Sequence, residues 1–378
     1  MFSYWEQESF SRYDHIVIGS GIVGLSVAIE LKEAYPESSV LVLERGLLPT
    51  GASTRNAGFA CMGSATELLD DLQHSSADEI VGLFERRKKG LERLRTRLGD
   101  DRIGYSGDGG YELISDHEID AMERLDMLNE LLLPVTGKPA FKPANELISV
   151  FGFARDYSRA LIENTCEGAL HSGMLLRALM DMCLHLGVEV KTGADVTEFH
   201  ESEQHVVVEV KDPFRDEILM LTCCTLSICT NAFTKKLLPD ADVKPGRGQV
   251  LITQPVAGLR FKGIFHFDKG YYYFREINGR VLFGGGRNLD FETEETTDFS
   301  LNKLIQIDLE QKLADIILPT THFQVAQRWA GIMAFGATKK PIVSAFSGRV
   351  FGAFRMGGMG VALGSEVARQ LAALIVNR

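Results

Sequence analysis

Three glycines near the N-terminus have the spacing of a phosphate-binding turn. Gly19, Gly21 and Gly24 follow an apolar segment and open a helical pattern. In such a turn the first glycine permits a tight bend, the second lets the backbone approach a pyrophosphate, and the third lets the helix pack on a sheet. The N–H groups at the helix start, around Ile22 and Val23, attract phosphate oxygens.

An acidic residue completes this pattern. Glu44 lies twenty residues after Gly24, at the end of a second apolar segment, and Arg45 follows it. A carboxylate at that position can accept hydrogen bonds from ribose hydroxyls. A glycine-rich turn without a ligand is the structural alternative. The complete order of strand, turn, helix, strand and acid favours a dinucleotide site.

A second glycine loop lies near the C-terminus, before a helix expected at residues 361–376. It contains Gly357, Gly358, Met359 and Gly360. A single pyridine dinucleotide site does not need glycine loops at both ends of a chain, whereas an FAD site often uses both. The pair of loops therefore predicts FAD as the cofactor.

Two arginines are candidates for binding a substrate carboxylate, because the guanidinium group matches a carboxylate with two hydrogen bonds. Arg355 directly precedes the C-terminal glycine loop. The alternative to a role in substrate binding is a structural ion pair between Arg355 and a surface acid. Arg275 follows three tyrosines. Tyr271 and Tyr273 alternate with Tyr272, so one of these two sets is expected to face the substrate and the other the core.

The composition is that of a water-soluble globular enzyme. The chain has 378 residues, 45% of them hydrophobic, and a formal net charge of -11. That charge argues against nucleic acid or an anionic membrane surface as the main partner. The six cysteines form no CxxC pair and no zinc-spaced cluster, so no metal site is predicted, and a cytoplasmic location is expected. No signal peptide and no apolar run of transmembrane length is recognised.

The hydrophobic pattern predicts the elements that position these residues. Helices are expected at residues 22–34, 66–98, 116–133, 171–186 and 299–317, with Pro134 ending the third. Separate strands are expected at 218–224 and 225–229. Strand-rich, aromatic segments at 247–254, 270–274 and 281–286 indicate an antiparallel sheet in another domain.

The sequence resembles the D-amino-acid oxidase superfamily of flavoproteins, in particular glycine oxidase, sarcosine oxidase and γ-glutamylputrescine oxidase. The resemblance covers nearly the whole chain and depends on the order of several stretches. They are HIVIGSGIVGLSVAIEL, LVLER with TGASTRNAGF, HSGMLLRALMDMCLHLGVEVKTGADVTEF, LSICTNAFTKKLLP, KPGRGQV, YYYFREINGRVLFGGG and FRMGGMGVALGSEVARQLA.

The resemblance implies an α/β fold. It consists of an FAD-binding Rossmann-type domain of the glutathione-reductase-like type and an interleaved α+β substrate domain with an antiparallel sheet. The FAD domain is expected at residues 1–85, 155–238 and 329–378, and the substrate domain at 86–154 and 239–328. By position, Glu44 would bind the adenosine ribose and Val196 would contact adenine through its backbone. The other residues implied at the cofactor are Ser53, Thr54, Arg55, Asn56, Ala57, Gly58, Thr230, Asn231, Gly357, Gly358, Met359 and Gly360.

The expected activity is oxidation of the C–N bond of an amino acid or related amine. Hydride transfer to flavin N5 gives an imine, which water hydrolyses, and oxygen or another acceptor takes the electrons. The expected partner is thus a small-molecule amine, and a homo-oligomer is compatible with the sequence. A flavoprotein acting on a modified tRNA base, a redox partner with little turnover and an NAD-dependent dehydrogenase are the alternatives. The acidic charge disfavours the first of these, and the rear glycine loop disfavours the last.

Three departures from the relatives limit what the resemblance implies. Relatives often read W-x-G-x-R, where the arginine anchors a carboxylate, but this chain has Met333 after Trp329 and Gly331. A simple glycine-like or sarcosine-like substrate is therefore in doubt. Residues 279–284 contain no lysine of the kind that helps sarcosine oxidases react with oxygen. The attachment points for covalent flavin are also missing: Asn56 lies where a histidine is found in some relatives, and no cysteine lies near Met333. Noncovalent FAD is predicted.

Overall fold

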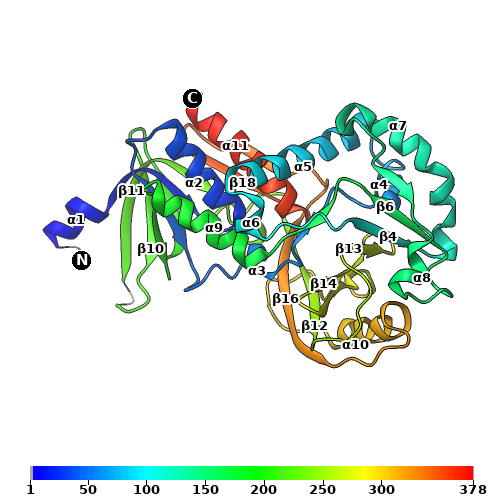
Figure 1. Ribbon diagram of the computed structural model, residues 1–378. Coiled ribbons are helices and arrows are strands. Elements are labelled where there is room, and N and C mark those ends of the chain that lie inside the picture. Colours follow the sequence, from blue (N-terminus) through cyan, green and yellow to red (C-terminus); the bar gives the residue numbers. More distant parts are fainter. Residues whose placement is uncertain (1–2, 216, 378) are drawn as a thin grey trace.

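The computed structural model describes residues 3–215 and 217–377 and contains two large sheets (Figure 1). The first sheet and its helices occupy the left of the view, and the second sheet lies at the lower right. Each sheet has eight strands. Segments from both ends and the middle of the chain build the first sheet, so the two halves of the molecule are interleaved in sequence.

The first sheet has a parallel centre. Its main order is β17-β18-β11-β1-β2-β8, while β10 pairs with β11 and β9 pairs with β10. Its strands are β1 (Arg12–Ile18), β2 (Val40–Glu44), β8 (Glu189–Thr192), β9 (Asp195–Glu201), β10 (Val206–Lys211), β11 (Ile218–Ile228), β17 (Ile342–Ala345) and β18 (Val350–Phe354). β1 is parallel to both β2 and β11, and β11 is parallel to β18. β11 is one continuous strand: its first half pairs with antiparallel β10, and its second half pairs with parallel β1. The expectation of two separate strands there was wrong.

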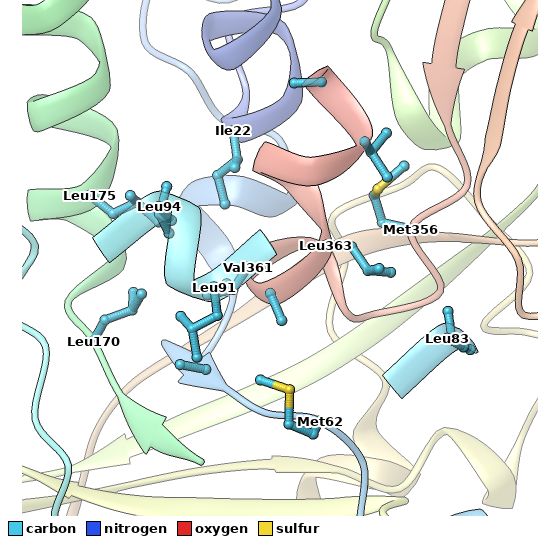
Figure 2. Close-up of a cluster of buried hydrophobic side chains, with 14 of the residues drawn as sticks. Ile22, Met62, Leu83, Leu91, Leu94, Leu170, Leu175, Met356, Val361 and Leu363 are labelled. Atoms are coloured by element: carbon cyan, nitrogen blue, oxygen red, sulfur yellow. The ribbon is translucent and has the colours of Figure 1, made fainter. Parts of the chain in front are cut away.

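Helices pack tightly on this sheet or on one another. They are α2 (Ile22–Ala34), α5 (Ala77–Leu98), α9 (Ser172–His185) and α11 (Gly360–Val376). A Cβ atom at Gly90 would lie 2.1 Å from the carbonyl oxygen of Ala362, and one at Gly364 would lie 2.7 Å from Ile22 Cγ2. Glycine thus allows α11 to approach α5 and α2 closely. Figure 2 shows the buried apolar contact that results, with Leu91, Val361 and Leu363 among its members. The last helix of the chain is in this way held beside the first glycine turn.

The second sheet has the order β16-β12-β15-β14-β13-β4-β6-β5. Its strands are β4 (Gly110–Ile114), β5 (Phe141–Pro143), β6 (Ala160–Asn164), β12 (Lys244–Thr253), β13 (Ile264–Phe267), β14 (Tyr272–Ile277), β15 (Arg280–Gly285) and β16 (Val325–Phe335). All its pairs are antiparallel except β13 with β4. The expected antiparallel sheet is confirmed. β6 and β16 belong to it, although the predicted domain boundaries at residues 155 and 328 would assign all of one and part of the other to the FAD domain.

An aromatic core covers one face of this sheet. Phe265 and Phe274 stack with ring centroids 4.7 Å apart, and Tyr272 stacks on Phe267 at 4.9 Å. The Tyr272 hydroxyl donates to Asp308 on α10 (Lys303–Lys312) at 2.8 Å. Because side chains alternate along a strand, Tyr271 and Tyr273 lie on the opposite face.

The remaining elements connect or flank the sheets. They are α1 (Tyr4–Phe10), α3 (Ala52–Arg55), α4 (Ala65–Asp71), α6 (Asp100–Ile103), α7 (Leu125–Thr136), α8 (Leu147–Phe151), the 3-10 helices η1 (Asp116–Arg124), η2 (Asn231–Lys236) and η3 (Arg287–Leu289), the π-helical turn η4 (Leu313–Ile317), and the short strands β3 (Phe59–Ala60) and β7 (Gly168–Ala169). No helix among the described residues has the length and apolarity needed to cross a bilayer.

Two helix predictions were wrong in detail. Residues 66–98 form two helices, because the Ser76 side chain accepts from Glu79 N–H and starts α5 afresh. Residues 116–133 form η1 followed by α7, and α7 continues through Pro134 to Thr136. Pro134 lies in the last turn, where only its own N–H bond is lost, and Gly137 closes the helix by donating to Leu133.

Candidate cofactor site

The turn between β1 and α2 can be made only by glycine. Gly19 has φ +104°, and a Cβ atom there would lie 2.8 Å from the carbonyl oxygen of Cys229. A Cβ atom at Gly24 would lie 1.8 Å from the carbonyl oxygen of Gly19. Gly21 is the N-cap of α2 and provides no side-chain cap. Ile22 N–H donates to Ser53 Oγ, and the N–H groups that follow it in the first turn, that of Val23 among them, point out of the turn. This is the cradle expected for a pyrophosphate.

Glu44 is held in a fixed orientation beside this turn. Its carboxylate accepts from the Ser20 hydroxyl at 2.7 Å, from Ser20 N–H at 3.2 Å and from Gly46 N–H at 2.9 Å. The side chain of Arg45 stacks on the Phe233 ring at 3.7 Å. The backbone before Val196 runs against the end of β2, where Ala194 N–H donates to the Glu44 carbonyl oxygen at 2.8 Å. The structure thus places Val196 two residues beyond a backbone contact with Glu44, and their roles at the cofactor stay a prediction.

Residues 53–58 cross over the glycine turn. Ser53 Oγ accepts from Ile22 N–H at 3.0 Å, and Asn56 Oδ1 accepts from Gly58 N–H at 2.8 Å. Thr54 Oγ1 donates to the Pro49 carbonyl oxygen at 2.6 Å. Arg55 and Ala57 join this segment to the second sheet. Arg55 Nη1 donates to the carbonyl oxygen of Ala330 on β16 at 2.9 Å. Ala57 packs with Val250 and Leu282.

The C-terminal loop lies at the end of β11. The Asn231 side chain accepts from the backbone N–H groups of Arg355 and Met356, at 3.1 and 3.3 Å. Thr230 shares a hydroxyl hydrogen bond with Thr234 at 3.0 Å. Gly357 and Gly358 have φ of +57° and +81° and lead into the N-terminus of α11 at Gly360. Met359 Sδ lies 3.4 Å from Cys61 Sγ, so the C-terminal loop contacts the segment that follows residues 53–58.

The side chain of Arg355 is fully engaged by the protein. It forms an ion pair with Asp242, donates to the Lys340 carbonyl oxygen at 2.9 and 3.0 Å, and donates to Thr338 Oγ1 at 3.2 Å. The Asp242 side chain is half exposed. These contacts favour the structural alternative, a pair with a surface acid, over the predicted role in binding a carboxylate.

The Arg275 side chain is also engaged by the protein, in this case by the backbone carbonyl oxygens of Gly58 and Leu170. Its Nη1 donates to Leu170 at 2.7 Å and to Gly58 at 3.2 Å. Burial lowers the pKa of Arg275 from its ordinary value. Tyr273 is half-buried between Phe59 and Gly284, and burial of its phenol raises its pKa to about 12. The Tyr271 ring is partly exposed. Arg275 thus holds the backbone at Gly58 and Leu170 in place, and Tyr273 contacts the neighbouring Phe59 ring.

A buried acid–histidine–thiol cluster was missed at the sequence level. Glu167 Oε1 accepts from Met62 N–H at 2.7 Å, and its Oε2 lies 3.7 Å from His266 Nε2. Cys61 Sγ is within 4.8 Å of ligand atoms of both. Burial alone would lower the pKa of His266, but the neighbouring Glu167 carboxylate raises it above its usual value. No short-range spacing signals this cluster, because its members come from β13 and two separate loops.

Residues 14–374 match the family described as FAD dependent oxidoreductase. The chain belongs to this family. The expected membership of the D-amino-acid oxidase superfamily is confirmed, as is the α/β fold with a Rossmann-type FAD-binding domain and a second, substrate domain. Comparison with curated protein sequences gives no significant match.

Several solved structures of this family share the fold. Glycine oxidase from Geobacillus kaustophilus has a TM-score of 0.77 and 21% identity, over 97% of this chain and 95% of that one. L-proline dehydrogenase from P.horikoshii has a TM-score of 0.77 and 18% identity, over 97% and 93%. Iminodiacetate oxidase (IdaA) from Chelativorans sp. BNC1 has a TM-score of 0.74 and 18% identity, over 96% and 95%.

The residues of this FAD-dependent oxidoreductase fit its cofactor. The start of α2, whose N-cap residue Gly21 has no side chain, suits the pyrophosphate, since a side chain at Gly21 would meet Ser53 Oγ at 2.9 Å and fill the turn. The oriented Glu44 carboxylate suits a ribose. The left-handed backbone at Gly357 and Gly358 leads into α11, whose N-terminal N–H groups suit an electron-rich ring edge.

Proposed function

We propose that this protein oxidises the C–N bond of an amino acid or related amine. The observation that carries the proposal is a contact: two loops, residues 53–58 and 357–360, lie against the second sheet. We call them the cofactor-side loops. A Cβ atom at Gly358 would lie 3.5 Å from Met333 Sδ, and one at Gly331 would lie 3.1 Å from Arg55 Cβ. A substrate carried by the second sheet would therefore lie against the residues that suit the flavin. The glycine oxidase, proline dehydrogenase and iminodiacetate oxidase folds are consistent with such a substrate.

The side chains at this junction are mostly apolar. Phe59 contacts Tyr273 and His266 edge to face, with ring centroids 5.6 and 5.2 Å apart. Met333 and Tyr273 both lie near Gly248. Such walls exclude water and fix the orientation of a small amine. Bound FAD supplies the acceptor for the hydride that leaves the substrate carbon, and water then hydrolyses the substrate imine to a carbonyl compound and free amine.

We further propose that FAD is held without a covalent bond. The Asn56 side chain is committed to its own turn, where it donates to Ser53 O at 2.8 Å. The thiol closest to the C-terminal loop is Cys61, and burial, followed by the charge of Glu167, raises its pKa well above the ordinary value. A neutral, buried thiol is a poor nucleophile. Yellow colour that leaves the polypeptide on treatment with SDS or acid supports this proposal, and colour that stays on the polypeptide contradicts it.

An anaerobic spectral titration tests the proposed oxidation. The purified holoprotein would be mixed with D- and L-amino acids, N-methyl amino acids and polyamines. Loss of the flavin band near about 450 nm with one class identifies the substrate class. Admission of air then tells whether oxygen or another acceptor restores the band. A yellow protein that no amine bleaches would contradict amine oxidation and leave a different substrate class on the same fold.

A further inference from the structure

One face of the second sheet is lined with glycine. Gly246 and Gly248 lie two residues apart on β12, and Gly284 lies on neighbouring β15. A Cβ atom at Gly248 would lie 3.0 Å from Met333 Cε, and one at Gly284 would lie 2.7 Å from the Tyr273 ring. This glycine face is opposite the aromatic core and carries the side chains that meet the cofactor-side loops.

Arg287 belongs to the same face. A Cβ atom at Gly246 would lie 2.4 Å from Phe335 Cε2 and 2.6 Å from Arg287 Nη1. Met333 pairs with Gly246 across the ladder, but its methyl group and the Tyr273 hydroxyl lie against Gly248. Since residues two apart on a strand share a face and are roughly 7 Å apart, the Arg287 guanidinium lies about one strand step from these two side-chain ends. Its guanidinium stacks on the rings of Phe335 and Phe291, with Cζ 4.0 and 4.9 Å from their centroids.

The Arg287 guanidinium has no anionic partner within residues 3–215 and 217–377. No hydrogen bond or ion pair is formed by its side chain with any of these residues, although the residue is only partly exposed. The nearby acids are already paired: Glu294 binds Arg247 at 2.6 Å, and Glu295 lies 3.3 Å from Lys244. Burial lowers the pKa of Arg287 despite the charges of Tyr271, Glu294 and Glu295.

Each of the arginines that are more deeply buried than Arg287 has at least one acceptor in the protein. Arg87 binds the Met62 carbonyl oxygen, Arg247 binds Glu294, and Arg275 and Arg355 have the partners described above. A partly buried cation that is stacked between two rings and keeps its N–H edge free is arranged to receive a planar oxyanion. Position 333, where relatives carry an arginine, has an apolar methionine instead.

We propose that Arg287 binds a carboxylate of the substrate in this protein. The proposal rests on the proposed amine oxidation and gives the substrate class: an amine whose acidic group lies several bonds from the oxidised carbon. The spacing follows from the position of the Arg287 guanidinium at Gly246, one strand step from the methyl end of Met333 at Gly248. An amine with its carboxylate on the oxidised carbon would have to place that carboxylate against Met333, where no cation is present.

Binding of acids that cannot be oxidised tests Arg287 without turnover. Benzoate and succinate would be titrated into the FAD-loaded protein, with the flavin spectrum and the thermal midpoint as readouts. The Arg287→Gln change is expected to weaken binding by about 30-fold, because a charge-assisted pair is lost. Arg287→Lys is expected to recover only part, since an ammonium group cannot form the planar pair.

Two further variants keep the result interpretable. Phe291→Leu removes one stacking ring from a partly exposed position and is expected to weaken binding less than Arg287→Gln does. Arg280→Gln is the matched control, because Arg280 donates to the Thr253 carbonyl oxygen on the same sheet at 2.9 Å, and binding should not change. Equal binding by wild type and Arg287→Gln, or no binding of either acid by wild type, would overturn the proposal.

A series of ω-amino acids, from glycine to 5-aminovalerate, tests the spacing in the anaerobic assay. Faster bleaching by the longer members, lost in Arg287→Gln, is expected. Fastest bleaching by glycine would overturn the placement of the acid while leaving amine oxidation intact. Conversely, acid binding that depends on Arg287 without bleaching by any amine would contradict the proposed oxidation alone.

Discussion

Arg275 on β14 donates to the carbonyl oxygen of Leu170 at 2.7 Å and thereby joins the second sheet to the segment before α9. The same Nη1 lies 3.2 Å from the Gly58 carbonyl oxygen. One buried cation therefore fixes two segments that reach the site from distant parts of the chain. A charged donor satisfies several carbonyl groups that would otherwise be buried without a partner.

Replacing Arg275 should loosen this junction. Arg275→Met is expected to cost about 2–4 kcal/mol of unfolding free energy, because the carbonyl groups lose their donor. FAD content per polypeptide should fall with it, and Arg275→Lys should be intermediate. Thermal unfolding and the ratio of flavin to protein absorbance measure both. Arg159→Met is the control, since Arg159 pairs with exposed Asp116. Unchanged FAD content in Arg275→Met would contradict the positioning role.

Two glycines in helices should respond oppositely to alanine. Gly24→Ala is expected to abolish FAD retention, because the added Cβ would lie 1.8 Å from the Gly19 carbonyl oxygen. Gly82 lies within α5, where an added Cβ meets nothing within 4 Å. Gly82→Ala should therefore stabilise the protein by about 0.5–1 kcal/mol through helix propensity. Measurement of FAD content and urea midpoints separates a specific clash from a general intolerance of substitution. Retention of flavin by Gly24→Ala would show that the turn can shift.

The contributions of Arg355 and Asp242 to the unfolding free energy should be coupled, because the two side chains form an ion pair. Each of Arg355→Gln and Asp242→Asn is expected to lower the unfolding free energy, and the double variant should lose less than the sum. A coupling of about 1 kcal/mol fits a pair that is open to solvent on one side. The double-mutant cycle would be measured by urea unfolding. If the two effects simply add, and Arg355→Gln instead weakens benzoate binding, the original carboxylate role of Arg355 would be restored.

The cofactor side of the molecule was readable from sequence because its constraints are local. Gly19, Gly21 and Gly24 are required by one turn, and Glu44 ends the next strand, so spacing along the chain carries the information. The repeated alternation in β12, β14 and β15 likewise indicated a second sheet. Such elements are specified by short-range sterics and by the period of the hydrophobic pattern.

The substrate side could not be read in this way because its contacts depend on register between distant strands. His266 faces Glu112 only because β13 pairs with β4 in parallel, and Arg287 meets Phe335 through the β12–β16 ladder. The role of Arg355 depended on Asp242, more than one hundred residues away in sequence. Residue type and position suggested a ligand contact there, but the tertiary partner occupies the guanidinium.

Glu112 should make the protein less stable as the pH rises. Its carboxylate accepts from Ala65 N–H at 2.8 Å and from the Thr66 hydroxyl, yet burial raises its pKa from 4.5 to about 7. A folded pKa above the unfolded value contributes stability that is complete below about pH 4.5 and is lost as the pH rises through 7. The loss amounts to about 3 kcal/mol for a shift of this size. The raised pKa of neighbouring His266 acts in the same direction, since its contribution also falls as the pH rises through its folded value.

The Glu112→Gln variant isolates this contribution. An amide can still accept from Ala65 N–H and can donate to the Thr66 hydroxyl, so it mimics the protonated acid. The variant should therefore gain stability relative to wild type as the pH rises from 4.5 to 8, measured by urea unfolding at each pH. Leu113→Val, at the next position on β4, removes no ionisable group and should shift stability equally at every pH. A constant difference between Glu112→Gln and wild type would show that the Glu112 carboxyl is ionised in the folded protein over this whole range, with its hydrogen bonds outweighing the cost of burial.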